Sequence, residues 1–286
     1  MISTVADQQQ LPHMSSKLLA SEILVGDSLK ILRGMEADQY QMCVTSPPYW
    51  GLRDYGIPGQ IGAEPTLEEY IQHLVAVFHE VRRVLKPTGT LWLNIGDGYT
   101  SGGRTWRHAD KKNPARGMDY RPKTPDGLKP KDLIGVPWRL AFALQADGWY
   151  LRSDIVWNKP NAQPESVKDR PNRSHEYVFL LTRNERYYYD HEAVKEKALR
   201  KGALRNKRTV WDVNTQSFSE AHFATFPTAL VEPCILAGSR AKDRVLDPFF
   251  GAGTVGLVCT ELGRPFDGIE LKEEYADLAR RRLGWV

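Results

Sequence analysis

The tetrapeptide Ser46-Pro47-Pro48-Tyr49 directly follows an apolar segment at 41–45, and its residue types are suited to catalysis. Each proline fixes its own φ angle, lacks an N–H donor and pushes the residue before it into an extended conformation. The sequence therefore predicts a stiff loop that points the Ser46 hydroxyl and the Pro47 carbonyl outward and ends in an aromatic ring. Such acceptors suit an amino group, and such a ring suits the flat face of a base.

Methylation of an exocyclic base amine is a reaction that needs this arrangement. The lone pair of the amine is delocalised into the base, and acceptors aimed at its two N–H groups favour a pyramidal, nucleophilic nitrogen. Unstacking the base costs a few kcal/mol, and stacking it on one aromatic side chain returns about 1–3 kcal/mol. A sulfonium methyl donor is already electrophilic, so we expect no metal. Taken alone, the tetrapeptide is equally compatible with a rigid turn that carries a half-buried tyrosine.

A second motif, at 245–254, has the sequence Val-Leu-Asp-Pro-Phe-Phe-Gly-Ala-Gly-Thr. A short apolar strand leads into a glycine turn, and a helix is expected to open at Gly253. Glu270 follows Gly251 by 19 residues, a distance at which an acid can accept both hydroxyls of a ribose. The pattern is compatible with a dinucleotide or with S-adenosylmethionine. The Asp-Pro-Phe-Phe start departs from the Gly-x-Gly-x-x-Gly pattern of dehydrogenases and argues against a nicotinamide cofactor.

The elements that must position these motifs alternate between short apolar runs and helical patterns, which is typical of an α/β doubly wound sheet. The helix predicted at 66–85 has apolar residues at three- and four-residue steps and is ended by Lys86-Pro87-Thr88-Gly89. We expect further helices at 137–146, 228–236, 253–262 and 272–283. Strands are expected at 23–25, 41–45, 90–95, 150–157, 177–182, 244–247 and 265–270.

The distribution of charge points to a polyanionic partner. The chain of 286 residues has a net charge of +4, yet 100–132 and 183–208 each carry nine basic and four acidic side chains. The rest of the chain therefore has a net charge of −6. Two basic segments on an acidic body favour contact with nucleic acid along one surface, although solvated loops give the same pattern.

Composition sets the remaining bounds. Hydrophobic residues make up 41% of the chain, so a folded core is expected, and no apolar run reaches the length of a membrane span. The polar start at 1–16 lacks the features of a signal peptide and is expected to be a flexible tail of a cytoplasmic protein. Cys43, Cys234 and Cys259 are far apart in apolar surroundings, so reduced, buried thiols are expected rather than a disulfide or zinc site.

These motifs together resemble the β class of amino-DNA methyltransferases, the cytosine-N4 and adenine-N6 family. In that family a Ser-Pro-Pro-Tyr type motif precedes a Phe-x-Gly-x-Gly motif, the order that Ser46–Tyr49 and Phe250–Gly253 have here. Four further segments are similar to family motifs: Val25-Gly26-Asp27, Gly268-Ile269-Glu270, Phe226-Pro227-Thr228, and the hairpin formed by 155–160 and 174–178.

The resemblance implies a circularly permuted, seven-stranded, Rossmann-like methyltransferase fold that uses S-adenosyl-L-methionine. Ser46, Pro47, Pro48 and Tyr49 are then the catalytic residues. The predicted cofactor-binding residues are Asp27, Thr45, Thr228, Asp247, Phe249, Gly251, Gly253, Thr254 and Glu270.

The resemblance also implies an organisation along the chain. The segments 17–183 and 226–286 form the catalytic and cofactor-binding parts of one domain, and 184–225 recognises the target. A basic insertion at 97–132 is expected to close over double-stranded DNA. Within it, the residues predicted to bind phosphates are Arg104, Arg107, Lys111, Lys112 and Arg116.

Serine at the first catalytic position is commoner among the cytosine-N4 members of this family, so cytosine is favoured over adenine. The implied protein is bacterial, archaeal or phage-encoded, and a cognate restriction endonuclease and a homodimer both stay open. The alternatives are an RNA or protein amide methyltransferase, a nucleotide-binding oxidoreductase, and a binding module without turnover.

Overall fold

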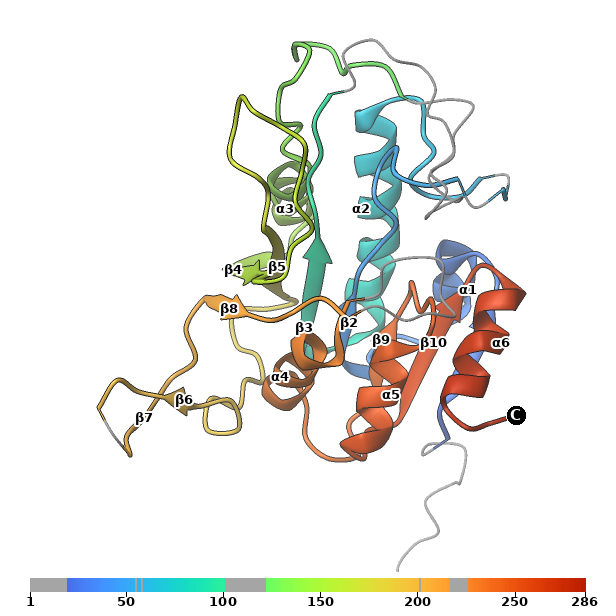
Figure 1. Ribbon diagram of the computed structural model, residues 1–286. Helices are drawn as coiled ribbons and strands as arrows, with labels where there is room; N and C mark the ends of the chain where they lie inside the picture. The colour runs from blue at the N-terminus through green and yellow to red at the C-terminus, as the bar shows by residue number, and fades with distance from the viewer. Residues whose placement is uncertain (1–19, 55, 58, 101–121, 201, 217–225) are drawn as a thin grey trace, which may run out of the picture.

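A computed structural model describes residues 20–54, 56–57, 59–100, 122–200, 202–216 and 226–286. Its centre is an eight-stranded sheet with the order β1-β10-β9-β2-β3-β5-β4-β8 (Figure 1). The strands are β1 (Glu22–Val25), β2 (Tyr40–Thr45), β3 (Leu85–Ile95), β4 (Tyr150–Asn158), β5 (His175–Thr182), β8 (Val210–Asp212), β9 (Val245–Asp247) and β10 (Phe266–Glu270).

Strand direction divides the sheet into two parts. The strands β1, β10, β9, β2 and β3 are parallel neighbours. The strand β5 is antiparallel to both β3 and β4, and β8 runs parallel to β4. The parallel part brings several strand ends to one edge, where open α/β sheets bind their ligands.

Helices cover both faces of the sheet. One buried cluster contains Leu32, Phe78 and Leu140 from α1 (Ser28–Gly34), α2 (Leu67–Val84) and α3 (Val136–Ala146). The other contains Val231, Val258 and Ala276 from α4 (Thr228–Gly238), α5 (Thr254–Glu261) and α6 (Glu273–Arg282). This is the doubly wound arrangement that the alternation of strands and helices predicts.

The helix α2 shows how a local sequence pattern determines an element of this fold. Thr66 and Glu69 form a reciprocal capping box at its start. The expected apolar stripe is buried along its length. The helix ends at Val84, as Pro87 requires, and β3 starts at Leu85, five residues before the strand predicted at 90–95, because Leu85 pairs with Tyr40. Pro87 is tolerated there because it lies near the start of the strand.

Three features were not predicted. The helix α1 spans seven residues and is capped by Asp27, whose carboxylate accepts from Lys30 N at 2.8 Å. The strand β8 adds an eighth strand to the expected seven, because Val210–Asp212 pairs with the free edge of β4. Between 196 and 205, β6 (Glu196–Lys197) and β7 (Leu204–Arg205) form a separate hairpin.

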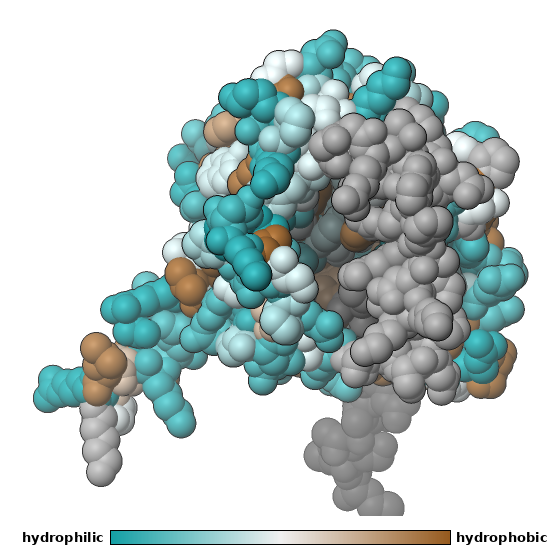
Figure 2. Space-filling model, turned by 45° about the horizontal axis from the view of Figure 1, so that its top comes forward, coloured by the Kyte–Doolittle hydropathy of each residue, from teal (hydrophilic) through white to brown (hydrophobic). Residues whose placement is uncertain are grey.

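The β6–β7 hairpin stands away from the body of the molecule (Figures 1 and 2). Its surface is mainly hydrophilic, with the apolar side chains of Leu199 and Leu204 exposed on it. Of the helices in the described ranges, none combines the length and the apolar character needed to cross a bilayer.

Gly268 lies in β10 where the strand packs closely against Phe250. A Cβ at this position would lie 2.3 Å from Cγ of Phe250, whose ring stacks on Phe266 at a centroid distance of 5.5 Å. Gly268→Ala should therefore lower the free energy of unfolding by about 1–3 kcal/mol through overpacking, as measured by urea denaturation. In the control Gly34→Ala, the Cβ meets nothing within 4 Å. Equal stability of Gly268→Ala and the wild type would contradict this packing.

Candidate active site

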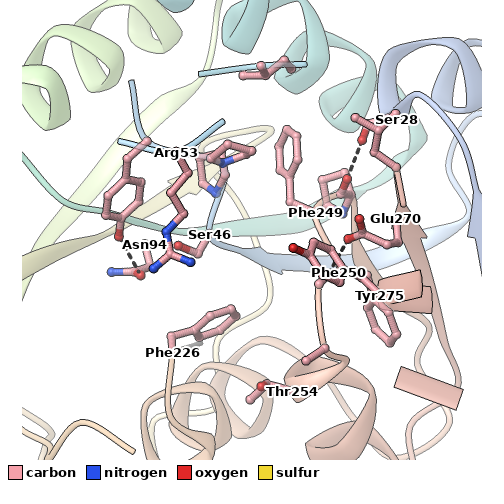
Figure 3. Close-up of a pocket in the computed structure, with 18 of the residues that line it drawn as sticks. Ser28, Ser46, Arg53, Asn94, Phe226, Phe249, Phe250, Thr254, Glu270 and Tyr275 are labelled. Carbon is pink, nitrogen blue, oxygen red and sulfur yellow. Dashed lines mark hydrogen bonds between the residues drawn. The ribbon is translucent and has the colours of Figure 1, made fainter. Parts of the chain in front are cut away.

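A cavity of about 240 Å³ opens at the carboxyl edge of the parallel strands. Figure 3 shows Ser46 and Asn94 at one end of it and Ser28 and Glu270 at the other. Of the predicted site residues, those that line the cavity are Asp27, Ser46, Pro47, Pro48, Tyr49, Phe249, Gly251, Thr254 and Glu270. The structure thus brings the two motifs, which lie 200 residues apart in the chain, into one cavity.

The loop Ser46–Tyr49, predicted to be catalytic, is held in place by α2. Tyr70 is fully buried in that helix, and its hydroxyl donates to the carbonyl of Pro48 at 2.8 Å. The Pro48 carbonyl therefore anchors the loop to α2, whereas Ser46 and Pro47 line the cavity. The expected stiff loop is present and has a second support besides its prolines.

Tyr49 is fixed at its hydroxyl. The hydroxyl donates to Oε2 of Glu176 at 2.7 Å, and Asn94 donates its amide to the same oxygen at 3.2 Å. Burial, followed by the charge of Glu176 and the hydrogen bond to it, raises the pKa of Tyr49 well above its ordinary value. The phenol is thus kept neutral and acts as a donor.

Glu270 ends β10 at the opposite end of the cavity. Its Oε2 accepts from Gly251 N at 2.8 Å, and its Oε1 accepts from Lys272 N at 2.9 Å. Burial raises the pKa of this carboxyl, and the backbone N–H groups oppose the rise. Each carboxylate oxygen keeps a further lone pair, so the pair of oxygens can still accept from two adjacent hydroxyls.

Thr45 and Asp247 lie beneath the cavity rather than on its wall. The Thr45 hydroxyl donates to Oδ1 of Asp247 at 2.6 Å, and Phe249 N donates to the same oxygen at 3.0 Å. Burial raises the pKa of Asp247 to about 7. The structure therefore gives Thr45 and Asp247 a role in joining the two loops.

Two further predicted cofactor residues also stand outside the cavity wall. Gly253 caps α5 with a φ of 76°, a left-handed conformation that glycine adopts without strain. Thr228 begins α4, and its neighbour Phe226 is the residue of that segment that lines the cavity. Their cofactor-binding role stays a prediction.

Sequence reasoning missed several cavity residues, including Ser28, Arg53, Asn94, Lys159, Glu176 and Tyr275. Lys159 and Glu176 lie in the predicted hairpin, at the ends of β4 and β5 where those strands pair. The similarity of this hairpin to a family motif was the available signal. The five predicted phosphate ligands, Arg104, Arg107, Lys111, Lys112 and Arg116, lie outside the described residues.

The expected reduced state of the cysteines is confirmed, because Cys43, Cys234 and Cys259 are free and buried. In the part of the chain that the structure describes, His, Cys, Asp and Glu side chains form no group of three or more that could hold a metal ion.

Comparison with known proteins gives the class. A family model described as "DNA methylase", of the N6/N4 type, matches residues 40–281. The chain therefore belongs to the N6/N4 DNA methylase family.

The relatives within this family are Type II DNA methyltransferases. The chain is 61% identical to Type II methyltransferase M.SmaI of Serratia marcescens over 94% of this chain and 93% of that protein. It is 62% identical to M.Cfr9I of Citrobacter freundii over 93% of this chain and 89% of that protein.

Solved structures agree on the fold. The PvuII DNA methyltransferase (cytosine-N4-specific) superposes with a TM-score of 0.68 at 21% identity, over 93% of this chain and 88% of that one. A DNA modification methylase of Thermus thermophilus, solved with S-adenosyl-L-methionine, gives a TM-score of 0.64 at 23% identity over 93% and 94% of the two chains. The expected methyltransferase fold is confirmed, with one strand more than expected.

Asp247 predicts a dependence of stability on pH. Its carboxyl has an ordinary pKa of 3.8 and a pKa of about 7 in the folded protein, so between these values the folded state holds a proton that the unfolded state has lost. Stability should therefore fall as pH rises from 4 to 7, by up to about 4 kcal/mol for this group. Asp247→Asn should remove most of that slope, since the amide keeps an acceptor for Thr45.

The measurement is urea unfolding at pH 5, 6, 7 and 8, with Asp126→Asn at an exposed position as the matched control. If Asp247→Asn kept the slope of the wild type, the buried carboxyl would not be its source.

Proposed function

We propose that this chain transfers the methyl group of S-adenosyl-L-methionine to the exocyclic amine of a flipped base in double-stranded DNA, with cytosine N4 as the favoured target. One observation carries the proposal: the Ser46–Tyr49 loop and the Gly251–Glu270 pair line opposite ends of one cavity. A methyl donor and an amine acceptor need such a shared space to react.

The residues at one end suit the methyl donor. The Glu270 carboxylate offers acceptors for two ribose hydroxyls, and Phe249 and Ile269 supply apolar walls for an adenine ring. Asp27 and Ser28 line the same end, where β1 stops. When bound there, the sulfonium supplies an electrophilic methyl group, so the chain itself has to orient the nucleophile.

The residues at the other end suit an amino group. Ser46 and Pro47 provide acceptors for its two hydrogens, and Tyr49 provides a ring for stacking. Because the loop is held by its prolines and by Tyr70, these dipoles need little reorganisation as positive charge develops on the nitrogen.

Cytosine is favoured by Ser46 and by the fold likeness to a methyltransferase named as cytosine-N4-specific. The adenine-N6 alternative requires the same acceptors. Mass spectrometry of nucleosides from the DNA of expressing cells distinguishes N4-methylcytosine from N6-methyladenine. The RNA and protein alternatives are tested by offering labelled methyl donor to duplex DNA, tRNA and cell protein. Label found only in the tRNA or only in the protein would overturn the choice of DNA.

The relatives are named Type II methyltransferases, which favours a role as the partner of a restriction endonuclease. We assign target recognition to 184–225, which contains the β6–β7 hairpin and β8, and DNA closure to the insertion 97–132. The described base of that insertion is anchored, since Thr100 N donates to Asp132 O at 2.9 Å. A homodimer stays an alternative to a monomeric enzyme. Light scattering, which measures the molar mass in solution, distinguishes the two.

Tyr49→Ala should lower the methyl-transfer rate about 5- to 150-fold, because stacking on one ring contributes about 1–3 kcal/mol. Affinity for the methyl donor should change little, since Glu270 lies at the other end of the cavity. Single-turnover transfer and calorimetric donor binding measure the two effects. Tyr150→Ala, at a tyrosine that is 46% exposed, is the control; a wild-type rate in Tyr49→Ala would refute the stacking role.

Joint replacement of Arg104, Arg107 and Lys111 by Gln should flatten the dependence of DNA affinity on salt. Each lost phosphate contact lowers the slope of log affinity against log salt by about 0.9. Fluorescence anisotropy over a salt series gives the slope, and an unchanged slope would show that these side chains do not meet phosphate.

A further inference from the structure

A polar network next to the catalytic loop has no role in the chemistry derived so far. Glu176 lies at the start of β5, and its side chain is 16% exposed. Its two oxygens accept from Tyr49, Asn94 and Lys159. All three partners are donors and Lys159 is a cation, an arrangement that suits an anchor for the Tyr49 hydroxyl.

Lys159 is fixed independently of Glu176. Its Nζ lies 4.1 Å from the centroid of the Trp157 ring, and its side chain is 17% exposed. Strand pairing sets Trp157 opposite Glu176 and Asn158 opposite His175. The register of β4 and β5 therefore determines the position of Glu176 in the sheet.

The backbone leaves room for this contact at Gly96. A Cβ there would lie 2.7 Å from Cε2 of Tyr49 and 3.2 Å from Cδ of Glu176. Any larger residue at 96 would push the ring and the carboxylate out of place. Three strands, β3, β4 and β5, thus converge on one phenol.

We propose that Glu176 is a positioning residue for methyl transfer: anchored by Lys159, it holds the hydroxyl of Tyr49 and so fixes the plane of the ring on which the target base stacks. This role rests on the proposed function and deepens it. It requires a tyrosine at the fourth position of the catalytic motif, because phenylalanine has the ring but lacks the hydroxyl that is held.

The test is a double-mutant cycle of Tyr49→Phe and Glu176→Gln, read by single-turnover methyl transfer to duplex DNA. Each single variant should slow transfer about 10-fold, as expected for a lost hydrogen bond to a charged group. The double variant should be no slower than either single one. Affinity for the methyl donor should stay at the wild-type value, and 2-aminopurine at the target position should report a less ordered flipped base.

Tyr40→Phe is a matched control, because the Tyr40 hydroxyl donates to the buried Asp267 at 2.5 Å, beside Arg244, at the opposite end of β2. It removes the same kind of contact and should change stability without slowing transfer. Multiplied losses in the double variant, or a wild-type rate in Glu176→Gln, would overturn the positioning role alone. A wild-type protein that methylates no DNA would overturn the proposed function and this role with it.

Discussion

The parallel pairing of β2 with β9 is the constraint on which the site depends. Met42 stands opposite Val245 and Cys43 opposite Leu246, so the two strands end at the same edge. The loops that follow them are then neighbours, although they are far apart in the chain. Thr45 and Asp247 join the two loops by a buried hydrogen bond. Burying Asp247 has a cost that shows as its raised pKa, and the donors from Thr45 and Phe249 offset part of it.

Fixed hydrogen bonds supply rigidity at both ends of the cavity. Tyr70 holds the catalytic loop through Pro48, and the backbone of Gly251 and Lys272 holds Glu270. The side chains at both ends of the cavity are thereby held in place by fixed hydrogen-bond partners. In the proposed function, acceptors held in this way act on developing charge without first having to move, and an already activated methyl group then needs no strong base.

The sequence was sufficient where a local pattern decided the structure. Apolar runs located seven strands, and the apolar stripe of α2 located the longest helix. It was insufficient where tertiary contacts decided. The strand β8 is three residues in a polar segment and exists because β4 offers an edge. Glu176 is a cavity residue because of its strand register, which no local sequence pattern shows. The seven-residue helix α1 was missed although its N-cap, Asp27, is a recognisable helix-start signal.

The edge pairing of β8 has a consequence for how recognition meets chemistry. Trp157 donates its indole N–H to Val213 O at 2.8 Å, and Asn158 donates to Asp212 at 2.8 Å. The region assigned to target recognition is therefore bonded to the strand that carries Lys159. From Lys159 the contacts continue through Glu176 to Tyr49. In the proposed function, a shift of β8 on DNA binding would act on the strand end that positions Tyr49, and recognition and catalysis would then share one structural element.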